Sequence, residues 1–359
     1  MNNQQKMLLQ ASRGVGAFTV LLFHVSAMSF KYFHYDLFGI SNIGRSGGVD
    51  YFFILTGFLL YTIYGKNIGT RKYVLPFLLN RLLRIYPFYW LITLVVLPVY
   101  FLVPSFGYGY ETHKDTIVKS LFLIPQIHGP VLSVAWSLSY FVLFYVLFSL
   151  LMALGRKVSF GLAVLWLALT LCNVLNVPII GSDIQNHVYL SFLFNEVNLE
   201  FAVGCLLAFW MMKHRARKPF VPLGAGMLGF LVIWLNNKYS LVPYYDVLLY
   251  DIPAVLVILG LISMPKIRSY SHWLRILSKL GDASYTILLT HLLFISIMMK
   301  LTKTTHFAYK IGFLSDDIMI VLLTLPLSYL VFILVEKPLV VKLKGVQHSQ
   351  KRSELIETP

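Results

Sequence analysis

One arginine and one histidine in the first apolar segment have the types and spacing of a membrane-embedded reaction site. Arg13 and His24 are eleven residues apart. At about 100° per residue, this spacing puts both side chains on one face of a helix, about 16 Å apart along its axis. Histidine exchanges protons near neutral pH, which suits it to general acid–base chemistry. We expect Arg13 near the cytoplasmic end and His24 deeper in the membrane. The alternative is that Arg13 is a flanking cation that reaches the lipid headgroups, and that His24 is a packing histidine.

Two further arginines, one helical turn apart, suggest a clamp for an anion. Arg81 and Arg84 occur in NRLLRIYPFYW, and their i, i+3 spacing puts both on one helix face. Guanidinium groups bind phosphates through paired hydrogen bonds and stack on flat rings. Tyr86 begins the aromatic cluster that follows. The functional interpretation is a cytoplasmic site for a phosphorylated ligand; the alternative is a positive anchor with an aromatic belt at the inner membrane surface.

Three ionisable residues in apolar stretches are further candidates, because such residues are costly in lipid and are often functional. Asp50 occurs in GGVDYFFILTGFLL at the outer start of the second apolar segment, where it could cap a helix or orient His24. Glu200 lies mid-span in FNEVNLEFAVGCLLAF, and His291 lies mid-span in GDASYTILLTHLLFI. Each is expected to find a partner inside the bundle.

Two segments at the ends of apolar stretches are less specific. Trp136 and Ser137 begin the segment AWSLSYF, where they could contact a substrate or serve as an interfacial anchor. Glu336-Lys337-Pro338 is expected to end the last span as a charged terminus followed by a helix breaker. Walker loops, dinucleotide fingerprints, G-x-S-x-G elbows and H-E-x-x-H motifs are absent from the sequence, and the histidines lack metal-ligand spacing. We expect no metal.

The composition requires that membrane helices position these residues. The chain has 359 residues, of which 58% are hydrophobic and 13% charged, and its mean hydropathy is +0.73. Soluble domains carry about 25% charged residues, so the composition predicts a polytopic membrane protein and excludes disordered, disulfide-stapled secreted and nucleic-acid-binding classes. The net charge of +15 fits cytoplasmic loops that face anionic lipid headgroups.

The expected fold is all-α, a bundle of about ten spans. Each span needs about 20 apolar residues. The candidate segments are 11–30, 48–65, 75–103, 131–153, 158–175, 188–212, 219–236, 246–264, 282–300 and 317–336. With the N-terminus inside, 22 of the 30 Lys and Arg residues fall on the cytoplasmic side, which favours both termini there. No cleavable signal peptide is expected. We assign 1–341 to the membrane domain and 342–359 to a polar cytoplasmic tail.

Taken together, these motifs resemble the bacterial membrane acyltransferase 3 family along nearly the whole chain. The marks in order are R-G-x-G with a histidine eleven residues after the arginine, GGVDYFFILTGFLL, FLLNRLLRIYP, WSLS, E-x-x-x-G at 200–204, LGDASYTILLTH and E-K-P. Each mark is weak alone, but seven in this order on a hydrophobic chain are specific.

The resemblance implies transfer of an acyl group, usually acetyl from acetyl-CoA, across the bacterial inner membrane to a sugar hydroxyl. The acceptor would be lipopolysaccharide O-antigen, capsule or exopolysaccharide. His24 looks like the family's essential histidine, as general base or transient acyl carrier, and Arg13 like its companion. Arg81 and Arg84 look like the R-x-x-R pair associated with acyl-CoA.

The chain departs from the family after WSLS, and one other function stays open. The family often continues with a valine, two glutamates and a glutamine, whereas this chain has Tyr140, Phe141, Val142 and Leu143. Asp50 or Glu200 could replace those carboxylates. A transporter or flippase for a lipid-linked glycan, without bond chemistry, would also use buried polar residues on several helices. The oligomeric state is left open by the sequence.

Overall fold

The computed structural model describes residues 1–41, 46–175, 177, 187–242, 249–267, 269–343 and 345. Within those ranges the regular structure is helical, without strands. Nine helices there are long and apolar enough to cross a membrane. The predicted fold class, an all-α polytopic bundle, is confirmed.

A helix occurs in each of the ten predicted segments. The helices are α1 (Asn3–Phe33), α2 (Gly48–Tyr64), α3 (Val74–Leu102), α5 (Trp136–Ala153), α6 (Arg156–Val174), α7 (Val188–Leu193) with α8 (Val197–Met211), α9 (Phe220–Tyr239), α10 (Asp251–Ser263), α12 (Ser284–Thr304) and α14 (Phe313–Val331). The eighth segment, 246–264, differs from the others in length. It is represented by α10, whose 13 residues extend about 20 Å, less than the roughly 30 Å hydrocarbon core.

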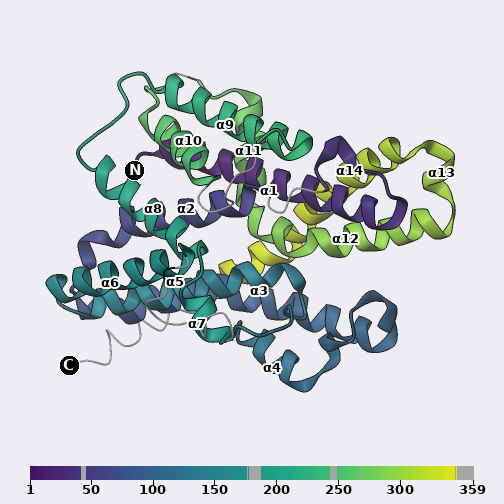
Figure 1. The fold of residues 1–359 in the computed structure, drawn as a ribbon, viewed down its shortest axis with the longest axis horizontal. Coiled ribbons are helices and arrows are strands. Elements are labelled where there is room, and N and C mark those ends of the chain that lie inside the picture. Colours follow the sequence, from purple (N-terminus) through teal and green to yellow (C-terminus); the bar gives the residue numbers. More distant parts are fainter. Residues whose placement is uncertain are drawn as a thin grey trace.

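Shorter helices connect these elements. They are α4 (Lys114–Leu121), α11 (His272–Asp282), α13 (Phe307–Ile311) and 3₁₀ turns that include η3 (Arg71–Tyr73), η5 (Tyr110–Thr112) and η6 (Ser133–Ala135). The sequence analysis did not anticipate α11, which lies along the first half of α1. Figure 1 shows α1 running through the middle of the view, with α11 and α12 beside it.

Two predicted spans have different limits in the structure. The segment 188–212 is broken between α7 and α8, where the Asn195 side chain accepts a hydrogen bond from the Val197 N–H (3.0 Å) at the start of α8. Glu200, expected mid-span, therefore lies in the first turn of α8, where it is buried. A carboxylate is favoured there by the helix dipole.

The last span continues past the residue expected to end it. After α14 the helix passes through a π-helical turn, η8 (Phe332–Glu336), and extends to Leu343. Pro338 has no N–H to donate to an earlier carbonyl, and the wider turn before it lets the helix continue. The expectation that Pro338 breaks the helix is wrong. Most of the predicted tail, residue 344 and residues 346–359, lies outside the described residues.

Close backbone approach holds the central helices together. A side chain at Gly57 of α2 would collide with the main chain of Phe201 on α8, and one at Gly281 of α11 would collide with the main chain of Gln10 on α1. The glycines therefore set how near these helix pairs come. In contrast, α6 and α9 expose apolar side chains such as Phe160 and Val221, as expected for lipid-facing helices.

Contacts between distant segments put both ends of the membrane domain on one side. Arg84, near the start of α3, contacts Glu336, at the end of η8. Glu336 also accepts a hydrogen bond from Thr286, in the first turn of α12. The start of α1 reaches the same end of the bundle, since Gln10 donates to Asp282 just before α12 (2.7 Å). An even number of crossings between α1 and η8 fits this arrangement.

Candidate functional site

The paired arginines of α3 line one cavity, as their spacing predicts. Arg81 and Arg84 lie one turn apart and border a space of about 380 Å³. Its other lining residues are Tyr64, Asn80, Leu83, Val340 and Leu343. We call this space the arginine cavity. The continuation of the last helix past Pro338 supplies its far wall, through Val340 and Leu343.

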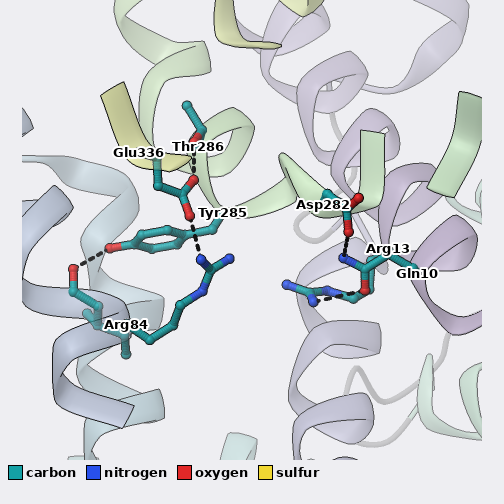
Figure 2. Close-up of polar contacts among 8 residues, drawn as sticks. Gln10, Arg13, Arg84, Asp282, Tyr285, Thr286 and Glu336 are labelled. Atoms are coloured by element: carbon teal, nitrogen blue, oxygen red, sulfur yellow. Dashed lines mark hydrogen bonds and ion pairs between the residues drawn. The ribbon is translucent and has the colours of Figure 1, made fainter. Parts of the chain in front are cut away.

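Arg84 is held by a buried carboxylate. Its guanidinium lies 2.8 Å from Glu336 Oε1, and the Glu336 side chain is wholly buried. The Thr286 hydroxyl donates to the other oxygen of Glu336. Tyr285 lies beside the pair and donates its hydroxyl to the Ile85 carbonyl (2.8 Å). Figure 2 shows Glu336 between Thr286 and Arg84, so α12 and η8 together orient this guanidinium.

Arg81 is surrounded by rings instead of acids. The centre of its guanidinium lies 5.2 Å from the ring centroid of Tyr64, 5.8 Å from Phe77 and 5.9 Å from Tyr145. Its Nε atom is buried without a hydrogen-bond partner among the described residues. Aromatic faces attract the cation and fix its position, but they do not cancel its charge. The guanidinium therefore keeps donors that an anion could use.

Arg13 faces the same region from α1. Its guanidinium donates to the side-chain oxygen of Gln10 (3.3 Å), and Gln10 donates in turn to Asp282 (2.7 Å). Arg13 lies within electrostatic range of Arg84 and Glu336, and the guanidinium groups of Arg13 and Arg84 point toward one another in Figure 2. Three arginines thus share two nearby carboxylates, Glu336 and Asp282, which leaves the region positively charged.

The His24 imidazole is paired with His291 of α12. His24 Nδ1 lies 2.9 Å from the Val20 carbonyl oxygen and 3.2 Å from His291 Nε2. His291 Nδ1 lies 2.9 Å from the Ile287 carbonyl oxygen. The ring centroids are 4.8 Å apart. His291 is buried and His24 half-buried, so α1 and α12 together hold two imidazoles inside the bundle.

These contacts favour one tautomer for each ring. A carbonyl oxygen only accepts hydrogen bonds, so each Nδ1 must carry its proton. His291 Nε2 is then unprotonated, and the single Nδ1–H of His24 is shared between it and the Val20 carbonyl oxygen. The remaining nitrogen, His24 Nε2, keeps its lone pair. This assignment follows from the hydrogen-bond network, and it leaves the lone pair on His24 Nε2, the nitrogen that does not contact Val20 or His291.

The histidine pair lies a short way along α12 from the arginine cavity. Thr286, which contacts Glu336, precedes His291 by five residues, a rise of about 7.5 Å. Arg13 and His24 are separated by about 16 Å on α1. An extended ligand held by its phosphates at Arg84 could therefore direct its other end toward His24.

Other predicted site residues lie elsewhere. Asp50 is buried in the first turn of α2. The Nδ1 contacts of His24 go to Val20 and His291, and a role for Asp50 beside His24 stays a prediction. Tyr86 donates its hydroxyl to the Phe122 carbonyl (3.0 Å) and is not among the described residues that line the arginine cavity.

A second cavity of about 300 Å³ lies at the start of α5. It is bordered by the segment 123–130 after α4, by α7 and by Trp136, Ser139 and Tyr140 of α5. Ser137, predicted with Trp136, is not part of the described lining; its hydroxyl donates to the Val134 carbonyl (3.1 Å). Arg81 packs on Tyr145, which follows Trp136 by nine residues, a rise of about 14 Å along α5.

Several residues in and around the arginine cavity were not predicted from the sequence. Glu336 was interpreted as a helix end, and Gln10, Asp282 and Thr286 were not singled out. Both LGDASYTILLTH and E-K-P were recognised as motifs, but their ion-pair and hydrogen-bond partners lie tens to hundreds of residues away. Among the described residues, no group of three or more His, Cys, Asp or Glu side chains could hold a metal ion.

Comparison with known proteins identifies the family. The family model of the acyltransferase domain matches residues 9–335. The chain belongs to this acyltransferase family. It is also 29% identical over 297 residues to the exopolysaccharide production protein ExoZ of Rhizobium meliloti (strain 1021), covering 78% of this chain and 83% of that protein. No solved structure matches. The chain is thus a multi-pass membrane acyltransferase.

Proposed function

We propose that this acyltransferase moves an acetyl group from cytoplasmic acetyl-CoA to a hydroxyl of a surface or lipid-linked polysaccharide, in the bacterial inner membrane. The observation that carries the proposal is the His24–His291 pair, which leaves His24 Nε2 as a free base near a cationic cavity. The match to the acyltransferase family favours bond chemistry over transport.

The donor site is supported by the charge of the arginine cavity. Coenzyme A carries phosphates, and Arg81 and Arg84 offer donors to the same space. Glu336 orients Arg84, and the rings of Tyr64, Phe77 and Tyr145 position Arg81. Phosphate oxygens would satisfy these donors through charge-assisted hydrogen bonds. Arg13 adds a third positive charge at the side nearer α1, and the acyl arm then extends along α12 toward the histidines.

The proposed chemistry needs one base and no metal. His24 Nε2 takes the proton of the acceptor hydroxyl, and the oxygen attacks the thioester carbonyl carbon. The carbon–sulfur bond breaks, and the imidazolium returns the proton to the leaving thiolate, which gives an ester and free coenzyme A. While His24 is positively charged, its Nδ1–H points at the lone pair of His291 Nε2, which stabilises the cation.

The acceptor class is supported by the relative. ExoZ is named as an exopolysaccharide production protein, and a polysaccharide outside the cell meets an enzyme of the inner membrane at its outer face or as a lipid-linked precursor. Lipopolysaccharide and capsule present the same chemistry, a sugar hydroxyl.

Two linked measurements test the function. Envelope polysaccharide from the encoding strain and from a strain lacking the gene is compared by mass spectrometry. We expect the deletion to remove the mass of an acetyl group from the repeat unit. Inverted membrane vesicles are then given labelled acetyl-CoA, and we expect the label on glycan. Unlabelled glycan that nevertheless crosses the membrane only when the gene is present would favour a flippase and contradict the proposal.

A further inference from the structure

The second cavity has the lining of a carbohydrate site. Trp136 is 45% exposed at its edge, and Tyr140 and Phe192 pack together beside it with ring centroids 4.1 Å apart. Ser139 and Asn195 add a hydroxyl and an amide. Rings that cover the C–H face of a sugar, with hydroxyl and amide groups at their rim, combine apolar contact with oriented hydrogen bonds.

The charge of this cavity differs from that of the arginine cavity. Among the described residues that line it, none is Asp, Glu, Lys or Arg. A phosphate or carboxylate would be left without a counter-charge there, which is costly in a partly buried site. The lining therefore favours a neutral polar ligand over coenzyme A, whose phosphates would find His128 as the one partner able to become positively charged among the described lining residues.

The segment 123–130 is anchored where it leaves α4. Three side chains of α3 donate to main-chain carbonyls in the last turn of α4 and directly after it: Tyr89 to Ser120 (2.7 Å), Trp90 to Leu121 (2.8 Å) and Tyr86 to Phe122 (3.0 Å). The aromatic cluster of α3, Tyr86, Tyr89 and Trp90, thus holds the end of α4 in place through these hydrogen bonds. A cavity that is already formed loses less entropy when it binds a ligand.

Further contacts within the segment fix its path across the cavity. The Ser120 hydroxyl accepts hydrogen bonds from the Gln126 side chain (3.2 Å) and the Val131 N–H (2.9 Å). Leu123 is buried with a left-handed backbone (φ 54°), a strained conformation that the surrounding structure must impose.

The segment also contacts the loop before α4. His128 stacks on Tyr110 of η5 (ring centroids 5.1 Å apart). Burial and the neighbouring Glu111 raise the pKa of Tyr110.

The second cavity borders the helix that carries His291. The turn η6, directly before Trp136, packs against α12. A sugar ring bound in the cavity would therefore lie beside the end of the bundle wall that α12 forms.

We propose that the second cavity binds a neutral sugar ring of the acceptor glycan, next to the ring that is acylated. Trp136 stacks on the ring, and Ser139 and Asn195 bind its hydroxyl groups. This inference rests on the proposed function, because it identifies the acceptor subsite of the same enzyme. It assigns the donor and acceptor to separate cavities at different depths along α5.

The experiment measures glycan binding separately from acyl transfer. Envelope polysaccharide of the encoding strain is de-O-acetylated, hydrolysed to oligosaccharides and separated into neutral and acidic fractions. Each fraction is titrated into the purified full chain in lipid nanodiscs. We expect the neutral fraction to bind and Trp136→Ala to weaken that binding about tenfold, a typical loss for a central aromatic anchor. Trp273→Ala, which removes an exposed tryptophan of α11, serves as the matched control and should bind like the wild type.

The outcomes separate this inference from the proposed function. Acetyl-CoA binding is measured on the same samples, and retained binding shows that Trp136→Ala is folded. Trp136→Phe keeps an aromatic face, so its affinity should lie between those of the wild type and the alanine variant. Equal glycan binding by wild type and Trp136→Ala, or binding of the acidic fraction alone, would overturn the subsite. Intact glycan binding without any transfer of label would instead contradict the proposed function.

Discussion

Replacing His291 by phenylalanine tests whether the second imidazole assists the first. The substitution keeps a planar ring of similar size in a buried position, but it removes the acceptor that lies 3.2 Å from His24 Nδ1. The Val20 carbonyl still holds the Nδ1 proton of His24 (2.9 Å). The tautomer of His24 should therefore be unchanged. The variant should lose only the hydrogen bond that stabilises the positively charged His24 during the reaction.

The expected loss can be estimated from that one hydrogen bond. Hydrogen bonds to charged groups contribute about 1.5–3 kcal/mol, and about 1.4 kcal/mol corresponds to a tenfold change in rate. We therefore expect His291→Phe to lower kcat about 10- to 150-fold while KM for acyl-CoA changes little. His291→Gln can place a side-chain oxygen near His24 and should keep more activity than the phenylalanine variant.

The assay is acyl transfer from labelled acetyl-CoA to glycan in membrane vesicles, at saturating donor. A His291→Phe rate within about twofold of the wild type would show that the pair is only a packing contact, since a lost hydrogen bond to a charged group must cost more. A glutamine variant no better than phenylalanine would contradict the acceptor role of His291 Nε2.

Two further predictions concern the arginine cavity. Arg84→Lys keeps the charge but loses the paired donors of the guanidinium, so acyl-CoA binding by the purified protein should weaken about tenfold. Arg275→Lys, on the exposed face of α11, is the control and should bind like the wild type. Equal acyl-CoA binding by the two variants would refute the clamp. Glu336→Gln removes the counter-charge of Arg84. Because the Arg84 side chain is 36% exposed, water can partly replace the carboxylate, and we expect a loss of about 1–3 kcal/mol, less than for a wholly buried pair. Thermal unfolding in detergent measures it, and an unchanged unfolding temperature would mean that the pair contributes no net stability.

The sequence predicted the features of this protein that are local along the chain. The apolar segments fixed where helices occur, because spanning helices must satisfy their backbone internally. The i, i+3 spacing correctly placed Arg81 and Arg84 on one cavity. The eleven-residue spacing of Arg13 and His24 turned both toward α11 and α12, as their contacts through Gln10 and with His291 indicate.

The partners of these residues could not be predicted in the same way. His24 and His291 are 267 positions apart, and helical periodicity gives no information about which faces of distant helices meet. Glu336 illustrates the same limit, since E-K-P at the end of a span is typical of a charged terminus. The π-helical turn that carries Glu336 into the bundle and lets the helix pass Pro338 depends on packing against α12. Tyr86 was grouped with the arginines because it is close in sequence, but its hydroxyl bonds to the segment after α4.

The measurement that tests the central claim most directly compares donor binding and acyl transfer in His24→Ala. General bases typically contribute 10²- to 10⁴-fold to a rate, and His24 lies about 16 Å from Arg13 along α1. We expect the variant to bind acetyl-CoA as the wild type does but to transfer its acetyl group to glycan at least about 100-fold more slowly. His113→Ala, an exposed histidine before α4, should leave both unchanged. Transfer by His24→Ala within tenfold of the wild-type rate would contradict the account.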